Sequence, residues 1–208
     1  MKNDGNLGYK GDVTPLQKIM LARRSVRKYE EGGVTADHVK SLYAVHDAFC
    51  EKMGFKASRI YIEFEKQARD GVVSAACSGF MGKGNPWIPL TRAQAVIVLA
   101  CNTASAPEIG DRKLALAQAA MAMEVVLLEA TELGLGTCWI AAINHKAIEK
   151  ALSLPEGTTV MAISTLGKPA KGISILSWDG MTYHLLSKKR KDLSQILFTD
   201  RLDNEYRR

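Results

Sequence analysis

Hydrophobic side chains recur at helical spacing after two threonines in the first third of the chain. Thr14-Pro15 begins the first predicted helix, because threonine caps the free amides of a helix and proline suits its first turn. We expect this helix to end near Arg23. Thr35 caps a second predicted helix, which has an apolar inner face and ends at Gly54.

A longer apolar helix is predicted from Lys113 to Leu133, ended by Gly134 and Gly136. It is long enough to cross a bilayer, but it carries one glutamine and three glutamates, which a membrane span avoids. We therefore interpret it as a mostly buried helix in a core or at a subunit interface. A short helix is predicted from His145 to Leu152.

Strand patterns occur in three other stretches. Residues 58–64 alternate and are rich in strand formers, and residues 159–166 form another expected strand. The continuous apolar run at 95–101 is typical of a central strand covered on both faces. Residues 71–91 are interpreted as a loop, and residues 173–186 as a short hairpin. Helices and strands are mixed without an internal repeat, which predicts an α+β or α/β domain.

Composition and cysteine pattern indicate how many domains to expect and in which cell compartment. The chain has 208 residues, 47% of them hydrophobic, which suits one buried core. We expect a single domain over residues 1–208, with a flexible N-terminus at 1–12 and a basic C-terminal extension at 188–208. The polar, glycine-rich start is unlike a signal peptide, and the four cysteines form no CxxC pair. Buried free thiols and a cytoplasmic location are expected.

The sequence lacks the motifs of several common classes of nucleotide-binding protein, metalloprotein and hydrolase. No Walker A sequence is present, and no GxGxxG opens a helix after a strand. The four histidines show no metal-ligand spacing and no acidic partner in register, so no metal site is expected. No GxSxG elbow supports a hydrolase, although the sequence leaves a Ser-His-Asp triad open.

The segment ARRSVRKYEEG, residues 22–32, concentrates positive charge in a chain of net charge +6. A solvated turn is one interpretation. A nucleic-acid patch is a second, but it would need basic residues along a face with aromatic platforms. A third is a monophosphate site, because arginine supplies a rigid fork for paired oxygens. Arg23, Arg24 and Ser25 fit that need, and Lys188 with Arg190 could close the other side.

Five motifs, taken in order, resemble those of the nitroreductase family of FMN-dependent oxidoreductases. They are RRSVRKY (residues 23–29), ELGLGTCWI (132–140), LPEG (154–157), LGKP (166–169) and KKRKDL (188–193). The divergent branch labelled TM nitroreductase is the most similar. The resemblance implies an α+β sandwich with a central mixed or antiparallel sheet flanked by helices, and a homodimer with the long helix in its interface.

The same resemblance implies FMN as cofactor and a role for each matched residue. Arg23 and Arg24 would bind the phosphate, Ser25 the ribityl chain or ring edge, and Arg27 would lie near the pyrimidine. The chain after Gly136 would line the flavin ring, and two late cations would complete the phosphate site. The implied cofactor-binding residues are Arg23, Arg24, Ser25, Arg27, Thr137, Cys138, Trp139, Ile140, Lys188 and Arg190.

Two departures from the family pattern are visible. Many members carry Pro-Ser-x-x-Asn-x-Gln-Pro-Trp after the second helix, where this chain reads CEKMGFKASRIYIEF (residues 50–64). The Gly-Asn-Pro-Trp at 84–87 comes too late to replace it. Ala141-Ala142 stands where members carry Glu-Gly. The substrate pocket and the usual pyrimidine contact are therefore not implied.

Three functions follow from these interpretations. The first is an FMN-dependent oxidoreductase that takes electrons from NADH or NADPH and reduces a nitroaromatic, quinone or related small-molecule acceptor. In that case the flavin carries the chemistry, no catalytic side chain is required, and neither nucleic acid nor membrane is a partner. The second is a flavin-binding store or sensor with little turnover. The third is a basic nucleic-acid-binding domain.

Overall fold

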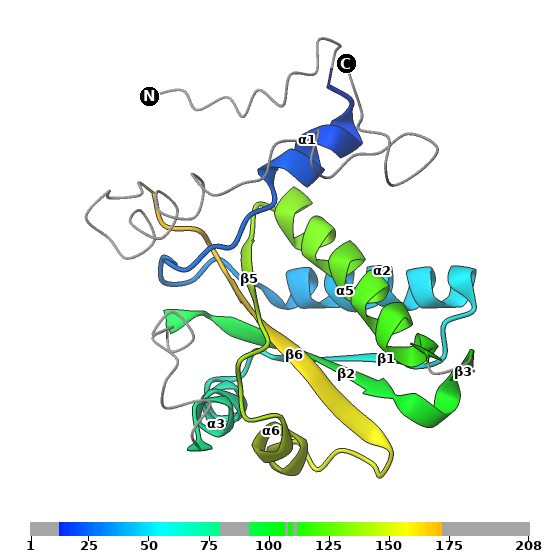
Figure 1. The fold of residues 1–208 in the computed structure, drawn as a ribbon. Coiled ribbons are helices and arrows are strands. Elements are labelled where there is room, and N and C mark those ends of the chain that lie inside the picture. Colours follow the sequence, from blue (N-terminus) through cyan, green and yellow to red (C-terminus); the bar gives the residue numbers. More distant parts are fainter. Residues whose placement is uncertain (1–12, 80–91, 107, 110–111, 172–208) are drawn as a thin grey trace, which may run out of the picture. The chain divides into compact units, whose positions relative to one another are not determined.

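The structure is a computed structural model that describes residues 13–79, 92–106, 108–109 and 112–171 (Figure 1). The chain divides after Ala170 into two units, and only Lys171 of the second is described. The predicted hairpin and the two predicted terminal segments lie outside the described residues. The single domain therefore stays a prediction, and the fold below is that of the first unit.

An antiparallel sheet of four strands organises this unit. Its order is β1 (Ser58–Glu63), β2 (Ala95–Asn102), β6 (Thr158–Gly167) and β5 (Gly136–Ile140), and each neighbouring pair is antiparallel. The register of β2 against β6 shifts between Leu99 and Ala100. A separate two-residue pair joins β3 (Glu108–Ile109) to β4 (Arg112–Lys113). The α+β class is confirmed, and the sheet is antiparallel rather than mixed.

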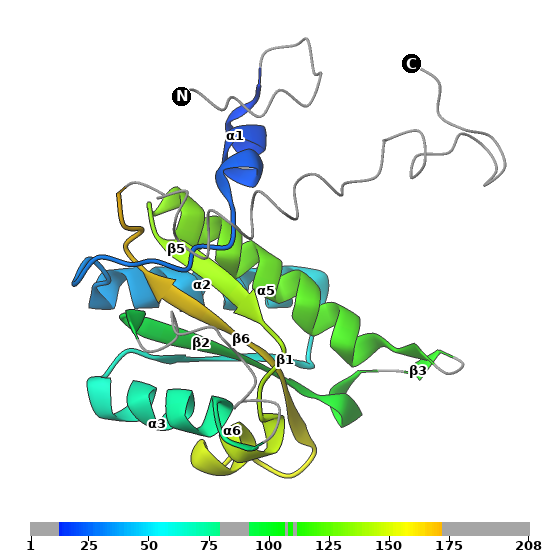
Figure 2. The same cartoon turned by 60° about the vertical axis from the view of Figure 1, so that its left-hand side comes forward.

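Helices cover both faces of this sheet (Figures 1 and 2). The helices α2 (Ala36–Met53) and α5 (Leu114–Glu132) pack on one face, and α3 (Lys66–Ala76) and α6 (His145–Ala151) pack on the other. The sequence of strand β2 is apolar up to Cys101 because both of its faces are buried. Ile97 and Leu99 join the core with α2 and α5, whereas Val96 and Val98 join the core with α3 and α6.

The predicted helix ends are confirmed where capping residues set them. The Thr14 side chain accepts from the Gln17 amide at the start of α1 (Pro15–Ala22), and Arg23 is its C-cap. Thr35 caps α2 in the same way, and Gly54 ends it with a left-handed φ of 67°. Such a φ suits glycine because it has no Cβ.

The long helix α5 is the helix of the described residues that could cross a membrane by length and composition. It packs instead against α2 and the sheet, and seven of its residues are buried. Two of its glutamates have partners in the fold. The Ser41 hydroxyl donates to Glu129 Oε1 at 2.6 Å, and Arg23 Nε lies 3.1 Å from Glu124 Oε1.

One element was wrongly predicted as loop. Helix α3 begins at Lys66 and includes Gly71, where the sequence predicts the start of a loop. This helix is hard to predict from the sequence, because Glu65 makes no side-chain capping bond and Gly71 lowers the helix propensity. Val72, Val73 and Ala76 are buried on its inner face, so tertiary packing overrides that weak propensity. Residues 80–91 lie outside the described residues.

Candidate functional site

The strap, residues 25–30, is an extended segment that lies beside β5 and the end of β6. Ser25 forms a parallel β-bridge with Thr137, and the Val26 amide donates to the Thr137 carbonyl at 2.7 Å. This contact covers the outer edge of β5, whose other edge pairs with β6. Two motifs from distant parts of the sequence, RRSVRKY and GTCWI, therefore meet in the structure.

The other end of the strap is paired with the chain that follows β6. Tyr29 bridges Pro169, and the Glu30 amide donates to the Lys168 carbonyl at 2.9 Å. The Ala170 amide donates to the Lys28 carbonyl at 3.0 Å. The LGKP motif and the following Ala170 thus hold the strap through backbone hydrogen bonds, which fix its register regardless of side-chain identity.

Two glycines make room for the strap. A Cβ at Gly136 would lie 2.8 Å from the side chain of Val26, and a Cβ at Gly167 would lie 2.7 Å from the ring of Tyr29. Real Cβ atoms do not approach other carbon atoms so closely, so any larger residue at either position would push the strap away. The glycines of the GLGT and LGKP motifs are therefore required by the close approach of the strap.

The Tyr29 side chain also links the strap to β6. Its hydroxyl donates to the Val26 carbonyl and shares a short hydrogen bond with the Thr165 hydroxyl of β6. Lys168 Nζ lies 3.1 Å from Glu30 Oε2 at the outer end. The strap is thus held at several points along its length.

The arginines before and within the strap differ in their surroundings. Arg23 Nε pairs with Glu124 of α5 at 3.1 Å, and the Arg23 side chain is 22% exposed. Arg24 and Ser25 are exposed, and Arg27 is half-buried. A guanidinium and a hydroxyl next to each other in solvent form a donor set for an oxyanion such as phosphate. The Glu124 carboxylate orients Arg23 but also offsets part of its charge.

The side chains of β5 point to both faces of the sheet. Cys138 and Ile140 belong to the core with α3 and α6, whereas Trp139 is partly buried against the core with α2 and α5. Thr137 is buried beside the strap. Cys138 and Ile140 are therefore already used inside the core, and Trp139 is the one of these three side chains that is only partly buried.

The structure brings part of the predicted site together. Arg23 and Arg24 immediately precede the strap, and Ser25, its first residue, contacts Thr137. Lys188 and Arg190 lie outside the described residues, as do Gly84–Trp87. The binding role of every predicted residue stays a prediction, but the two motifs of the described part that carry most of them are in direct contact.

A second polar cluster was missed by the sequence analysis. His46 and Asp47 are neighbours in α2, and His46 Nδ1 lies 2.9 Å from Asp47 Oδ1. His46 Nε2 lies 2.9 Å from the Ser58 hydroxyl, so the three groups have the order of a hydrolase triad. Ser58 is only 1% exposed, which keeps a substrate carbonyl from its hydroxyl. The histidine's acidic partner was overlooked because it is the next residue in the chain.

Comparison with known protein families gives one match. The model of the family described as the nitroreductase family matches residues 62–168, slightly more than half of the chain. This range contains β5 and β6 but begins after the strap. No curated protein sequence matches the chain.

Solved structures agree with this match at the level of the fold. A nitroreductase family protein from Clostridium novyi NT is 22% identical, with a TM-score of 0.64, over 93% of this chain and 97% of that chain. One from Clostridium difficile 630 is 19% identical, with a TM-score of 0.68, over 89% and 98%. An FMN-dependent nitroreductase from Clostridium difficile R20291 is 19% identical, with a TM-score of 0.61, over 84% and 96%.

Proposed function

Because the chain belongs to the nitroreductase family, we propose that it is an FMN-dependent oxidoreductase that uses NADH or NADPH to reduce a small acceptor. The acceptor class is nitroaromatic, quinone or a related compound. One structural relative is itself called an FMN-dependent nitroreductase, which supports the choice of cofactor. The observation that carries the proposal is the bridge between Ser25 and Thr137, which joins the two motifs expected to bind FMN.

The donors at the start of the strap suit the phosphate of FMN. Arg24 and Ser25 are exposed side by side, and Arg23 stands at the C-terminal end of α1. Each charge-assisted hydrogen bond to a phosphate oxygen contributes on the order of 1.5–3 kcal/mol. Since phosphate is the only strongly charged group of FMN, these residues should decide the preference for FMN over riboflavin.

The rest of the proposed site follows from the strap's position. Thr137 and the backbone of β5 lie directly beside Ser25. A ligand whose ring lies next to β5 would therefore have its phosphate chain close to Ser25. When bound, FMN would supply the two-electron chemistry. The chain's own residues would bind and orient it, and no proton donor from the protein is required by this proposal.

We also propose a homodimer, in which the exposed apolar side chains of α1 and α5 contact the partner. Helix α1 has no buried residue, and its Leu16, Met20 and Leu21 are 60%, 55% and 53% exposed. On α5, Leu116 and Met121 are 40% and 48% exposed. A group of large apolar residues in water marks an interaction surface.

An absorption spectrum of the freshly purified chain tests the proposed function. We expect flavin bands, FMN in the supernatant after denaturation, and bleaching by NADH or NADPH under argon. Flavin bands without bleaching would favour a flavin store or sensor. A colourless protein that takes up no FMN, together with salt-sensitive binding to random DNA, would favour the nucleic-acid alternative and end the proposal.

A further inference from the structure

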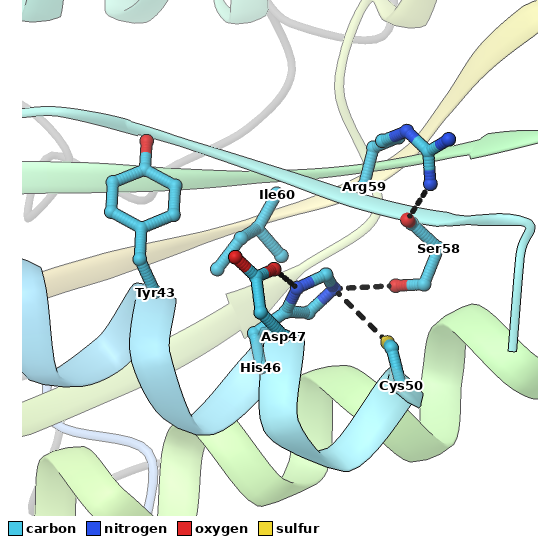
Figure 3. Close-up of a pocket in the computed structure, with 7 residues that line it drawn as sticks. All are labelled: Tyr43, His46, Asp47, Cys50, Ser58, Arg59 and Ile60. Atoms are coloured by element: carbon cyan, nitrogen blue, oxygen red, sulfur yellow. Dashed lines mark hydrogen bonds and ion pairs between the residues drawn. The ribbon is translucent and has the colours of Figure 1, made fainter. Parts of the chain in front are cut away.

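The polar cluster around His46 is closed on itself. It lines a pocket of about 360 Å³ between α2 and β1. Figure 3 shows that one ring nitrogen of His46 contacts Asp47, while the other contacts Ser58 and Cys50. Both nitrogens of the ring therefore have partners within the fold, and neither is free for a ligand.

Arg23 presents the opposite case, because its guanidinium is held by charge and makes no hydrogen bond to a described residue. Its Nε lies 3.1 Å from Glu124 Oε1 of α5. Although this nitrogen is buried, its N–H is not aligned with the carboxylate, and it has no hydrogen-bond partner among the described residues. The ion pair therefore restrains Arg23 at the end of α1 and leaves the N–H donors of its guanidinium available.

A cation that is fixed in place and has unused donors is suited to an oxyanion. A buried N–H without an acceptor destabilises the fold, and an oxygen supplied by a ligand would remove that cost. Arg24 and Ser25, the next two residues, are exposed and add further donors. The unused donors of Arg23 thus fit the phosphate of the proposed cofactor.

We propose that Glu124 is a positioning residue for FMN, because it holds the Arg23 side chain in place before the phosphate binds. This inference rests on the FMN site proposed above. A long side chain that loses its rotational freedom on binding lowers the affinity by about 2- to 12-fold. Because Glu124 already restrains Arg23, most of that loss occurs on folding instead. Arg24 makes no ion pair with a described residue, so its side chain must become ordered when the ligand binds.

Glu124 also carries a negative charge, which opposes an anionic ligand. Its side chain is 48% exposed, and the Debye length is about 8 Å at physiological salt, so solvent and ions screen this repulsion. The attraction between Glu124 and Arg23 acts across only 3.1 Å, where screening is weak. We therefore expect orientation to outweigh repulsion. The two effects predict opposite changes in FMN affinity when the charge of Glu124 is removed.

Glu124→Gln tests the sign of the effect, since it removes the charge and keeps the shape of the side chain. Fluorescence titrations use the flavin-free, full-length protein in a phosphate-free buffer. FMN should bind about 3- to 10-fold more weakly than to the wild type. The affinity for riboflavin, which lacks the phosphate, should change little. Glu132→Gln is the matched control and should bind FMN as the wild type does, because Glu132 is exposed on the same helix and makes no ion pair with a described residue.

A double-mutant cycle tests whether Glu124 acts through Arg23. In an Arg23→Gln background, Glu124→Gln should have little further effect on FMN binding, because the side chain that it orients is absent. In an Arg24→Gln background, the loss caused by Glu124→Gln should persist. A general loosening of the segment would instead weaken FMN and riboflavin together, and that result would overturn the proposal.

The remaining outcomes separate this inference from the proposed function. Tighter FMN binding by Glu124→Gln would mean that repulsion dominates, and it would overturn the positioning role. Unchanged binding, or equal losses in Glu124→Gln and Glu132→Gln, would do the same. In each of these cases the FMN site would stand, because the wild type would still prefer FMN to riboflavin. A wild type without that preference would end both the FMN site and the role of Glu124.

Discussion

Ser25 and Thr137 form a parallel bridge that places the arginine-rich end of α1 against the first residues of β5. The Val26 amide donates to the Thr137 carbonyl at 2.7 Å, so the bridge is made by backbone atoms. Backbone pairing fixes where Arg24 and Ser25 stand relative to β5. A charged segment and a glycine-rich segment that are ordinary by themselves are brought together into one candidate site by this contact.

Gly136→Ala should disturb this contact directly. Its Cβ would lie 2.8 Å from Val26, and the branched valine cannot move aside without moving the strap. Overpacking of this kind costs about 1–3 kcal/mol. We expect a lower free energy of unfolding by urea denaturation and weaker FMN binding in the folded variant.

Gly71→Ala is the matched control for that change. Gly71 lies in the middle of α3, and a Cβ there would have open space around it. The same substitution should stabilise the protein by about 0.5–1 kcal/mol, because alanine favours a helix over glycine. If the two variants had equal stability, the close packing of the strap on β5 would be refuted.

Met121→Glu should dissociate the proposed homodimer. Met121 is 48% exposed on α5, and a buried interface charge without a partner is costly. Light scattering after size exclusion should show a dimer for the wild type and a monomer for the variant. Met53→Glu is the control, because Met53 is 47% exposed at the end of α2. A monomeric wild type, or a variant that stays dimeric, would contradict the proposed interface.

The stability of the fold should fall at alkaline pH. Burial raises the pKa of the Cys101 thiol above its ordinary value of 9.0, and Lys113 lowers it in part. The folded chain therefore keeps this proton to a higher pH than the unfolded chain does. The associated stability is complete below about pH 9 and is lost as the pH rises through the folded pKa.

Urea midpoints measured from pH 7 to pH 10.5 check this prediction. Cys101→Ala should lower the midpoint at pH 7, since it leaves a cavity beside β2. It should also reduce the fall above about pH 9. Part of the fall should remain, because burial also raises the pKa values of Cys77 and Tyr43. An unchanged slope would mean that Cys101 does not contribute.

The elements that the sequence predicted are those with strong local signals. The run from Ala95 to Cys101 could be assigned to a central strand because both of its faces are apolar, and capping threonines marked α1 and α2. Helix α3 was missed because its caps are weak and Gly71 interrupts its pattern. Local patterns predict elements, and packing decides those without such patterns.

The candidate site was predictable in its residues but not in its geometry. The motifs named Arg24 and Thr137, yet nothing local shows that Ser25 pairs with β5 or that Gly136 makes room for Val26. Such contacts depend on chain segments far apart in the sequence. The cluster of His46 with Cys50 was missed for another reason. This cluster joins side chains of α2 and β1, so no single stretch of the sequence shows its members together.

Arg24→Gln should weaken FMN binding by tenfold or more, because at least one charge-assisted bond of about 1.5–3 kcal/mol is lost. Its affinity for riboflavin should change little. Lys28→Gln removes the same charge from another exposed position of the same segment and serves as the control. Flavin fluorescence titrations measure both variants. Equal losses in the two would indicate a general effect of net charge instead of a phosphate contact.

Comparison of FMN with riboflavin in titrations of the wild-type chain tests the central claim most directly. The two ligands share the ring and differ in the phosphate that Arg23, Arg24 and Ser25 are proposed to bind. FMN should bind at least about tenfold more tightly, as one charge-assisted bond alone would give. Equal affinities, or no binding of either ligand, would contradict the proposed flavin site beside β5.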